Sequence, residues 1–257
     1  MRKYATEFVG TFFLVFTICN AVFAKAALAP LAIGVVLAAL VFAGGHISGA
    51  HYNPAVTVAV YLRGRLPARD LAPYFAAQIL GASAAAGITR WMVGPAPDPP
   101  FAAHGQGIAA ALVAELLVTF ALAYVVLNVA TSKDHPNNSF YGLAIGFTVL
   151  AGAVAVGGLS GGVFNPAVAF GVSVAGLVSW TMLWVYAVAN LAGGALAAVA
   201  FRLLNPTDLH EPSVPTAAEE VHALAQLGQL NPIEADRTPS ERAVRHAAGN
   251  ESSQLGR

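Results

Sequence analysis

Two Asn-Pro-Ala sequences carry the side chains whose types and spacing are best suited to chemistry in this chain. They consist of Asn53, Pro54 and Ala55, and of Asn165, Pro166 and Ala167. An asparagine directly before a helix caps the N–H groups of its first turn, and proline is well tolerated at the first helical position. Each Asn-Pro-Ala box is therefore predicted to begin a helix, with its asparagine amide free to donate a hydrogen bond.

A single Asn-Pro pair is typical of an ordinary turn, but here both boxes belong to an internal repeat. The segment GGHISGAHYNPAVTVAV, which begins at Gly44, matches GGLSGGVFNPAVAFGV, which begins at Gly157. Four further residues of each half lie at matching positions: Glu7, Thr11, Gln78 and Gly81, and Glu115, Thr119, Asn190 and Gly193. A match of this length indicates that the two boxes share a role.

The elements that position these boxes are predicted to lie in a membrane. Hydrophobic residues make up 57% of the chain and charged residues only 10%, with a mean hydropathy of +0.65. No Asp, Glu, Lys or Arg occurs between Lys25 and Arg63, or between Asp134 and Arg202. A spanning helix needs about 20 apolar residues. Stretches of this kind occur at about 4–24, 28–45, 71–93, 108–130, 140–157 and 177–204.

The predicted fold class is an all-α membrane protein with six transmembrane helices, since spanning segments must satisfy their own backbone hydrogen bonds. Three spans per half is an odd number, so the halves form an inverted repeat. The box-containing segments 49–61 and 161–174 are too short to span and are interrupted by glycine and proline. They are predicted to be two re-entrant half-helices that line a pore at mid-membrane.

The chain divides into a membrane body, residues 1–204, and a polar tail, residues 205–257. The first repeat covers about 4–93 and the second about 106–204. The tail is polar and rich in proline, which predicts a largely disordered segment. Most basic residues of the body fall in loops on one side, and the positive-inside rule assigns that side, with both termini and the tail, to the cytoplasm.

The paired boxes and their repeat resemble the major intrinsic protein family, the aquaporins and glycerol facilitators, over about residues 4–204. The resemblance implies a pore whose facing helix starts repel protons and cations. It also implies that Asn53 and Asn165 donate to permeating molecules, while carbonyl groups of residues 49–52 and 161–164 accept from them. Glu7 and Glu115 match buried family glutamates that anchor these loops, a structural role in preference to one in transport.

The narrowest point of family pores is an outer constriction, and its four positions fall here on Ile33, Ala153, Gly162 and Val168. Val168 replaces the usual arginine, and Ala153 replaces the histidine of water-specific members. This apolar filter is expected to be wider and to lack one fixed positive charge. Glycerol facilitators typically carry aspartate where this chain has Ala169. Valine at the arginine position is similar to that of tonoplast-type plant aquaporins.

The resemblance also places a histidine at the cytoplasmic mouth, and His46 is matched to it. His46 is expected either to act as a gate or constriction, or to support the loop. His51 is expected only to shape the loop.

The sequence thus favours a passive channel for water, small uncharged solutes such as ammonia, hydrogen peroxide, urea and neutral metalloid acids, or both. A secondary transporter of a small solute is the alternative, because transporters also use inverted repeats. Against it, no ionisable pair remains in the body to couple ions. No cluster of His, Asp, Glu or Cys is visible at mid-membrane, so no enzyme activity, metal site or cofactor is expected.

The expected partners are the permeating molecules and the lipid bilayer, with no nucleic acid. By the resemblance, the protein is expected to be a homotetramer with one pore per subunit. The first span is too long for a signal-peptide core, so it is expected to be retained in a multi-pass protein of the cell (inner or plasma) membrane.

Overall fold

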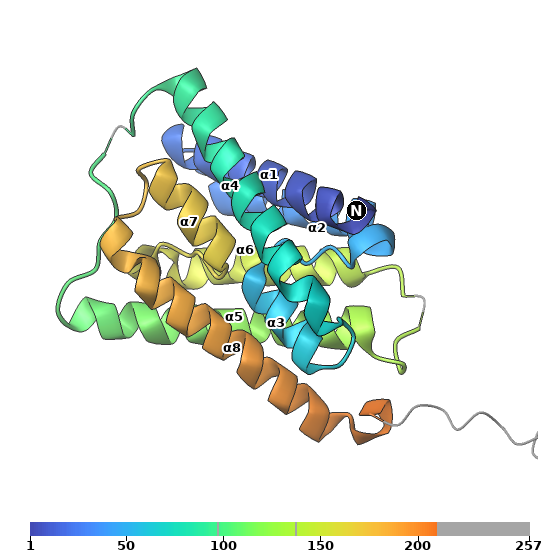
Figure 1. Cartoon of the computed structure of the whole chain (residues 1–257). Helices are drawn as coiled ribbons and strands as arrows, with labels where there is room; N and C mark the ends of the chain where they lie inside the picture. Colours follow the sequence, from blue (N-terminus) through green and yellow to red (C-terminus); the bar gives the residue numbers. More distant parts are fainter. Residues whose placement is uncertain (97, 137, 210–257) are drawn as a thin grey trace, which may run out of the picture. The chain divides into compact units, whose positions relative to one another are not determined.

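The computed structural model describes residues 1–96, 98–136 and 138–209 (Figure 1). Within these residues, six helices are long and apolar enough to cross a membrane, which confirms the predicted class. They are α1 (Arg2–Phe23), α2 (Ala29–Ser48), α4 (Leu71–Val93), α5 (Gln106–Thr131), α6 (Tyr141–Ser160) and α8 (Leu183–Leu204). Short 3-10 turns, η1 (Ala68–Asp70) and η2 (Trp180–Met182), lead into α4 and α8.

The two half-helices form where the boxes predict them, as α3 (Pro54–Leu62) and α7 (Pro166–Val174). Each has 9 residues, and at 1.5 Å per residue it rises only about 14 Å, less than half of a bilayer core of about 30 Å. Figure 1 shows α3 beside α8 and α7 beside α4. Each half-helix therefore packs against the last spanning helix of the opposite repeat.

Within each repeat the first spanning helix crosses the last one closely, α1 on α4 and α5 on α8. Glycine permits both crossings. A Cβ atom at Gly81 would lie 2.4 Å from the carbonyl oxygen of Phe8, and one at Gly193 would lie 2.6 Å from that of Leu116. Small residues at such crossings let helix backbones approach in a membrane. The repeat seen in the sequence is thus a repeat of packing geometry.

The compact unit extends to Asp208, past the expected boundary at residue 204, because the short turn η3 (Pro206–Leu209) continues from α8. The Asp208 carboxylate is buried and accepts hydrogen bonds at 3.0 Å from Arg63 Nη2 and from the Lys133 backbone N–H. These contacts hold η3 to the loops after α3 and α5. The prediction of a disordered tail concerns residues 210–257, which lie outside the described residues.

Candidate pore

The Asn-Pro-Ala boxes cap their half-helices as the sequence predicts. Asn53 Oδ1 accepts a hydrogen bond of 2.8 Å from the Ala55 N–H, and Asn165 Oδ1 accepts one of 2.9 Å from the Ala167 N–H. Both asparagines have extended backbones, as N-caps do. Because the amide oxygens are occupied in this way, the amide nitrogens of both side chains point away from the helices.

Each amide nitrogen, however, donates one of its two N–H groups to a carbonyl group of the opposite loop. Asn53 Nδ2 donates to the Phe164 carbonyl at 2.9 Å, and Asn165 Nδ2 donates to the Tyr52 carbonyl at 2.8 Å. One N–H group of each amide therefore remains for a permeating molecule. Likewise, the Tyr52 and Phe164 carbonyl groups already accept these hydrogen bonds. In this they differ from the other loop carbonyl groups that are expected to accept from permeating molecules.

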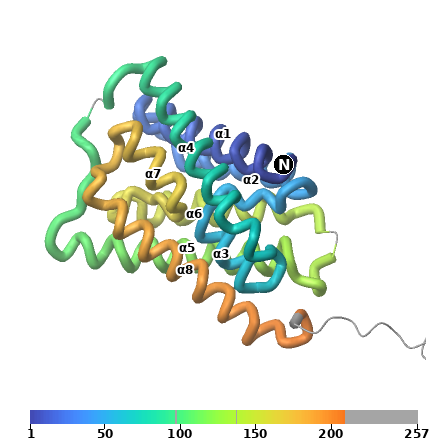
Figure 2. Tube along the Cα trace, in the orientation of Figure 1, coloured from blue at the N-terminus to red at the C-terminus, as the bar shows by residue number. Residues whose placement is uncertain are grey.

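The loops before the boxes, which lead into α3 and α7 in Figure 2, have unusual backbone angles. Gly49, Ala50 and Tyr52 have φ values of +83°, +50° and +48°, and the second loop repeats the pattern at Gly161, Gly162 and Phe164 with +88°, +66° and +52°. Residues other than glycine rarely adopt this left-handed region. Such a backbone persists only where surrounding contacts hold it.

Buried glutamates supply those contacts. Glu7 Oε1 accepts from Ser48 Oγ at 2.7 Å and the His51 N–H at 2.9 Å, while Oε2 accepts from the Tyr52 N–H at 2.7 Å and Gln78 Nε2 at 2.8 Å. With four donors pointing at it, this carboxyl group functions as an ionised acceptor.

Glu115 makes the matching set of bonds in the second repeat. It accepts from Ser160 Oγ at 2.7 Å and from the N–H groups of Val163 and Phe164 at 2.9 and 2.7 Å. With its amide oxygen toward the Asn165 N–H, Asn190 supplies the fourth donor at 3.0 Å. The structure thus brings both glutamates onto the loops that carry the boxes, where the family resemblance implied that they anchor the loops.

A cavity of about 220 Å³ lies where the two loops meet. Asn53 and Asn165 line it, and so do all four residues counted out as the filter: Ile33, Ala153, Gly162 and Val168. None of the described residues that line this cavity is an arginine, lysine, aspartate or glutamate. The structure therefore gathers the boxes and the filter positions around one largely apolar passage.

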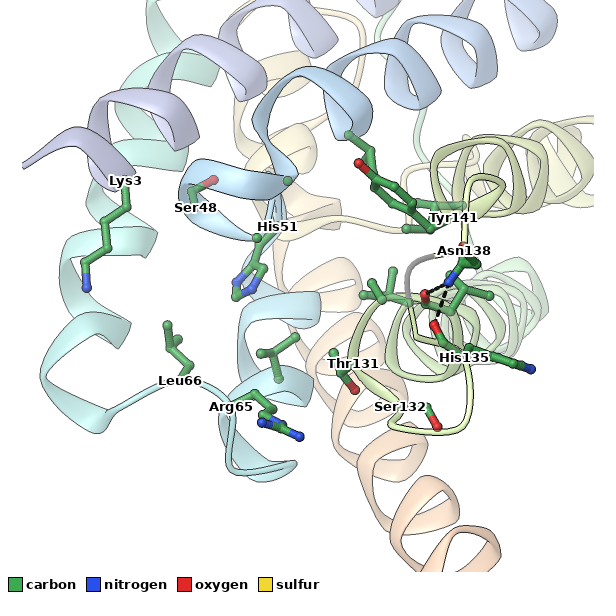
Figure 3. Close-up of a pocket in the computed structure, with 18 of the residues that line it drawn as sticks. Lys3, Ser48, His51, Arg65, Leu66, Thr131, Ser132, His135, Asn138 and Tyr141 are labelled. Atoms are coloured by element: carbon green, nitrogen blue, oxygen red, sulfur yellow. Dashed lines mark hydrogen bonds between the residues drawn. The ribbon is translucent and has the colours of Figure 1, made fainter. Parts of the chain in front are cut away.

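A second cavity of about 700 Å³ opens at the end where Lys3, Arg65 and Lys133 lie. Figure 3 shows His51 beside this space, with Tyr141 and Arg65 on other sides. His51 lines both cavities, whereas His46 is exposed and lines neither. The expectation that His51 only shapes the loop is therefore incomplete, and a role for His46 as a gate or as a support of the loop stays a prediction.

Together, the fold and this passage define an inverted-repeat membrane channel. A family model described as Major intrinsic protein matches residues 1–201. Glycerol uptake facilitator protein-like 6 of Lactiplantibacillus plantarum is 39% identical over 222 residues, covering 81% of this chain and 100% of that protein. Probable aquaporin TIP4-1 of Oryza sativa subsp. japonica is 40% identical over 222 residues, covering 79% and 87%.

The X-ray structure of the aquaglyceroporin from Plasmodium falciparum superposes with a TM-score of 0.69 at 22% identity, covering 80% of this chain and 97% of that one. At this identity the likeness shows the fold alone, and that fold is the one predicted. The chain belongs to the major intrinsic protein family of membrane channels.

Proposed function

We propose that this protein is a passive channel for water and small uncharged solutes, with a filter that lacks arginine. The observation that carries the proposal is the single passage lined by both Asn-Pro-Ala asparagines and by Ile33, Ala153, Gly162 and Val168. The candidate solutes are ammonia, hydrogen peroxide, urea and neutral metalloid acids. Relatives named as a glycerol uptake facilitator and as aquaporins support this class of permeants.

Val168 is the residue on which selectivity should depend. Its side chain is buried at the start of α7 and lines the passage. An arginine at this position would add hydrogen-bond donors and a positive charge, whereas valine leaves space and an apolar surface. Neutral solutes that are larger than water, and that form few hydrogen bonds on one face, can then pass through the filter as water does.

A channel accounts for the buried carboxylates better than a transporter does. A transporter that couples solute to protons or sodium needs an ionisable group that is free to change its partner. In the described spans, Glu7 and Glu115 are the carboxylates deep within the membrane body, and each already has four hydrogen-bond donors. Flux should accordingly follow the solute gradient without an ion gradient.

Stopped-flow light scattering on proteoliposomes tests the proposal with water, urea and glycerol. The wild type should pass water and urea, and Val168→Arg should reduce the urea flux more than the water flux. Val168→Ile is the matched control, because it keeps the filter apolar and uncharged. Passage of water alone by the wild type would contradict a broadened filter. Equal loss of the water and urea fluxes in Val168→Arg would show that the introduced arginine blocks the pore without changing its selectivity.

We further propose a homotetramer in the cell (inner or plasma) membrane with both termini in the cytoplasm. The orientation is supported by the basic residues that gather at one end: Lys3 pairs with Asp70, Arg63 with Asp208, and Arg202 donates to the Leu62 carbonyl. The opposite end carries the exposed pair Lys25–Asp98. Native mass spectrometry in detergent tests the tetramer, and labelling of single cysteines at both ends in intact cells tests the orientation.

A further inference from the structure

One difference between the two repeats beside the passage is a pair of polar side chains. In the first repeat, His51 and Thr57 flank the box, and their side chains contact each other, with 3.1 Å between His51 Nδ1 and Thr57 Oγ1. The equivalent positions of the second repeat, counted from Asn165, are Val163 and Ala169. The second loop keeps the same backbone without such a pair, so the fold itself does not require it.

The hydrogen bonds around Thr57 Oγ1 can be assigned one by one. Gln78 must direct its Nε2 at Glu7, because a carboxylate only accepts hydrogen bonds. One of the two N–H groups on Nε2 donates to Glu7, and the other donates to Thr57 Oγ1 at 3.0 Å. The Thr57 hydroxyl donates to the Asn53 carbonyl at 2.9 Å. Thr57 Oγ1 has then used its one proton and one of its two acceptor positions.

The remaining contact of Thr57 therefore requires a donor, and that donor is His51 Nδ1. The hydroxyl is fully buried, so no bulk water competes for its last acceptor position. We infer that Thr57 is a positioning residue that holds neutral His51 in the tautomer with the proton on Nδ1, leaving Nε2 as a bare hydrogen-bond acceptor at the junction of the two cavities. Free histidine favours the opposite tautomer, with its proton on Nε2.

This inference deepens the proposed function, on which it rests, by giving the passage a fixed order of donors and acceptors. Asn53 contributes a donor at the centre, and His51 Nε2 contributes an acceptor nearer the large cavity. A molecule between them accepts from one and donates to the other. Permeants that carry N–H or O–H groups, such as water, ammonia and urea, meet both demands.

Nitrogen-15 NMR of histidine-labelled protein in lipid at near-neutral pH reads the tautomer directly, and needs no flux measurement. The His51 signals are identified by their loss in His51→Asn. In the wild type, Nδ1 should show the protonated, pyrrole-type shift and Nε2 the bare, pyridine-type shift. Thr57→Ser, which keeps the hydroxyl, should give the same pattern, whereas Thr57→Val should move the proton to Nε2.

A wild-type spectrum with the proton on Nε2 would overturn the inference, because Thr57 would then donate to His51. An unchanged pattern in Thr57→Val would also overturn it, since the tautomer would have another cause. The wild-type spectrum decides the question even if Thr57→Val fails to fold. Because flux is measured separately, failure of the tautomer assignment and failure of the channel proposal remain distinguishable.

Discussion

The buried glutamates that anchor the loops accept four hydrogen bonds each, and Glu115 shows what those bonds require. Both of its oxygens accept hydrogen bonds, so Glu115→Gln would turn the new amide nitrogen toward the N–H group of either Val163 or Phe164. A buried donor left without a partner costs about 1–3 kcal/mol, and we expect a matching loss of thermal stability in detergent. Asp98→Asn is the control, because Asp98 is 63% exposed and exposed pairs contribute about 0–1 kcal/mol. Equal melting of wild type and Glu115→Gln would show that this carboxyl group is protonated.

The internal repeat identified the two boxes, and the family resemblance supplied the role of the glutamates and the four filter positions. The structure places those four positions with Asn53 and Asn165 around the inner cavity. From the sequence, His51 is expected only to shape the loop, whereas His51 also lines both cavities and His46 lines neither. The positive φ angles of the loop from Gly49 onward cannot be read from hydropathy or spacing.

At the scale of elements, the left-handed loops are the most demanding parts of the fold. Gly161 has φ +88°, and a Cβ atom there would lie 3.2 Å from Tyr186 Oη. Alanine in this region costs about 1–2 kcal/mol, so Gly161→Ala should lower the melting temperature. Gly158 lies in α6, and a Cβ atom there would meet no neighbouring group within 4 Å; Gly158→Ala should instead stabilise the protein by about 0.5–1 kcal/mol. Equal effects of the two substitutions would contradict the strain assigned to the loop.

The spans were predictable from hydropathy, but one boundary was not. The last span was expected to begin at residue 177, whereas the helix itself begins at Leu183 after a short turn. Residues Leu177 and Ser179 instead exchange backbone hydrogen bonds of 2.9 Å with Phe101. Hydropathy cannot reveal this contact, since an apolar strand-like segment and the first turn of an apolar helix have the same composition.

At the scale of the whole unit, the buried pair Arg63–Asp208 joins the ends of α3, α5 and α8. Burial raises the pKa of Asp208, but the Lys133 N–H, Ser132 and the Arg63 charge outweigh burial and hold that pKa below its usual value of 3.8. A depressed pKa stabilises the fold above the unfolded value and loses this contribution as pH falls through the folded value. The melting temperature of Asp208→Asn should thus be lower than that of the wild type near neutral pH. The difference should shrink as pH falls below 3.8; a constant difference would contradict the assignment.

The crossed bonds from Asn53 to the Phe164 carbonyl and from Asn165 to the Tyr52 carbonyl also bear on biosynthesis. The ribosome makes the first repeat before the second, so a first half-helix that entered the lipid at once would have neither its amide donor nor its loop carbonyl paired. Leaving such groups bare in hydrocarbon is costly, which favours a nascent chain that keeps α3 near the aqueous exit of the translocon until α7 arrives. The passage can then close only after α7 has been synthesised.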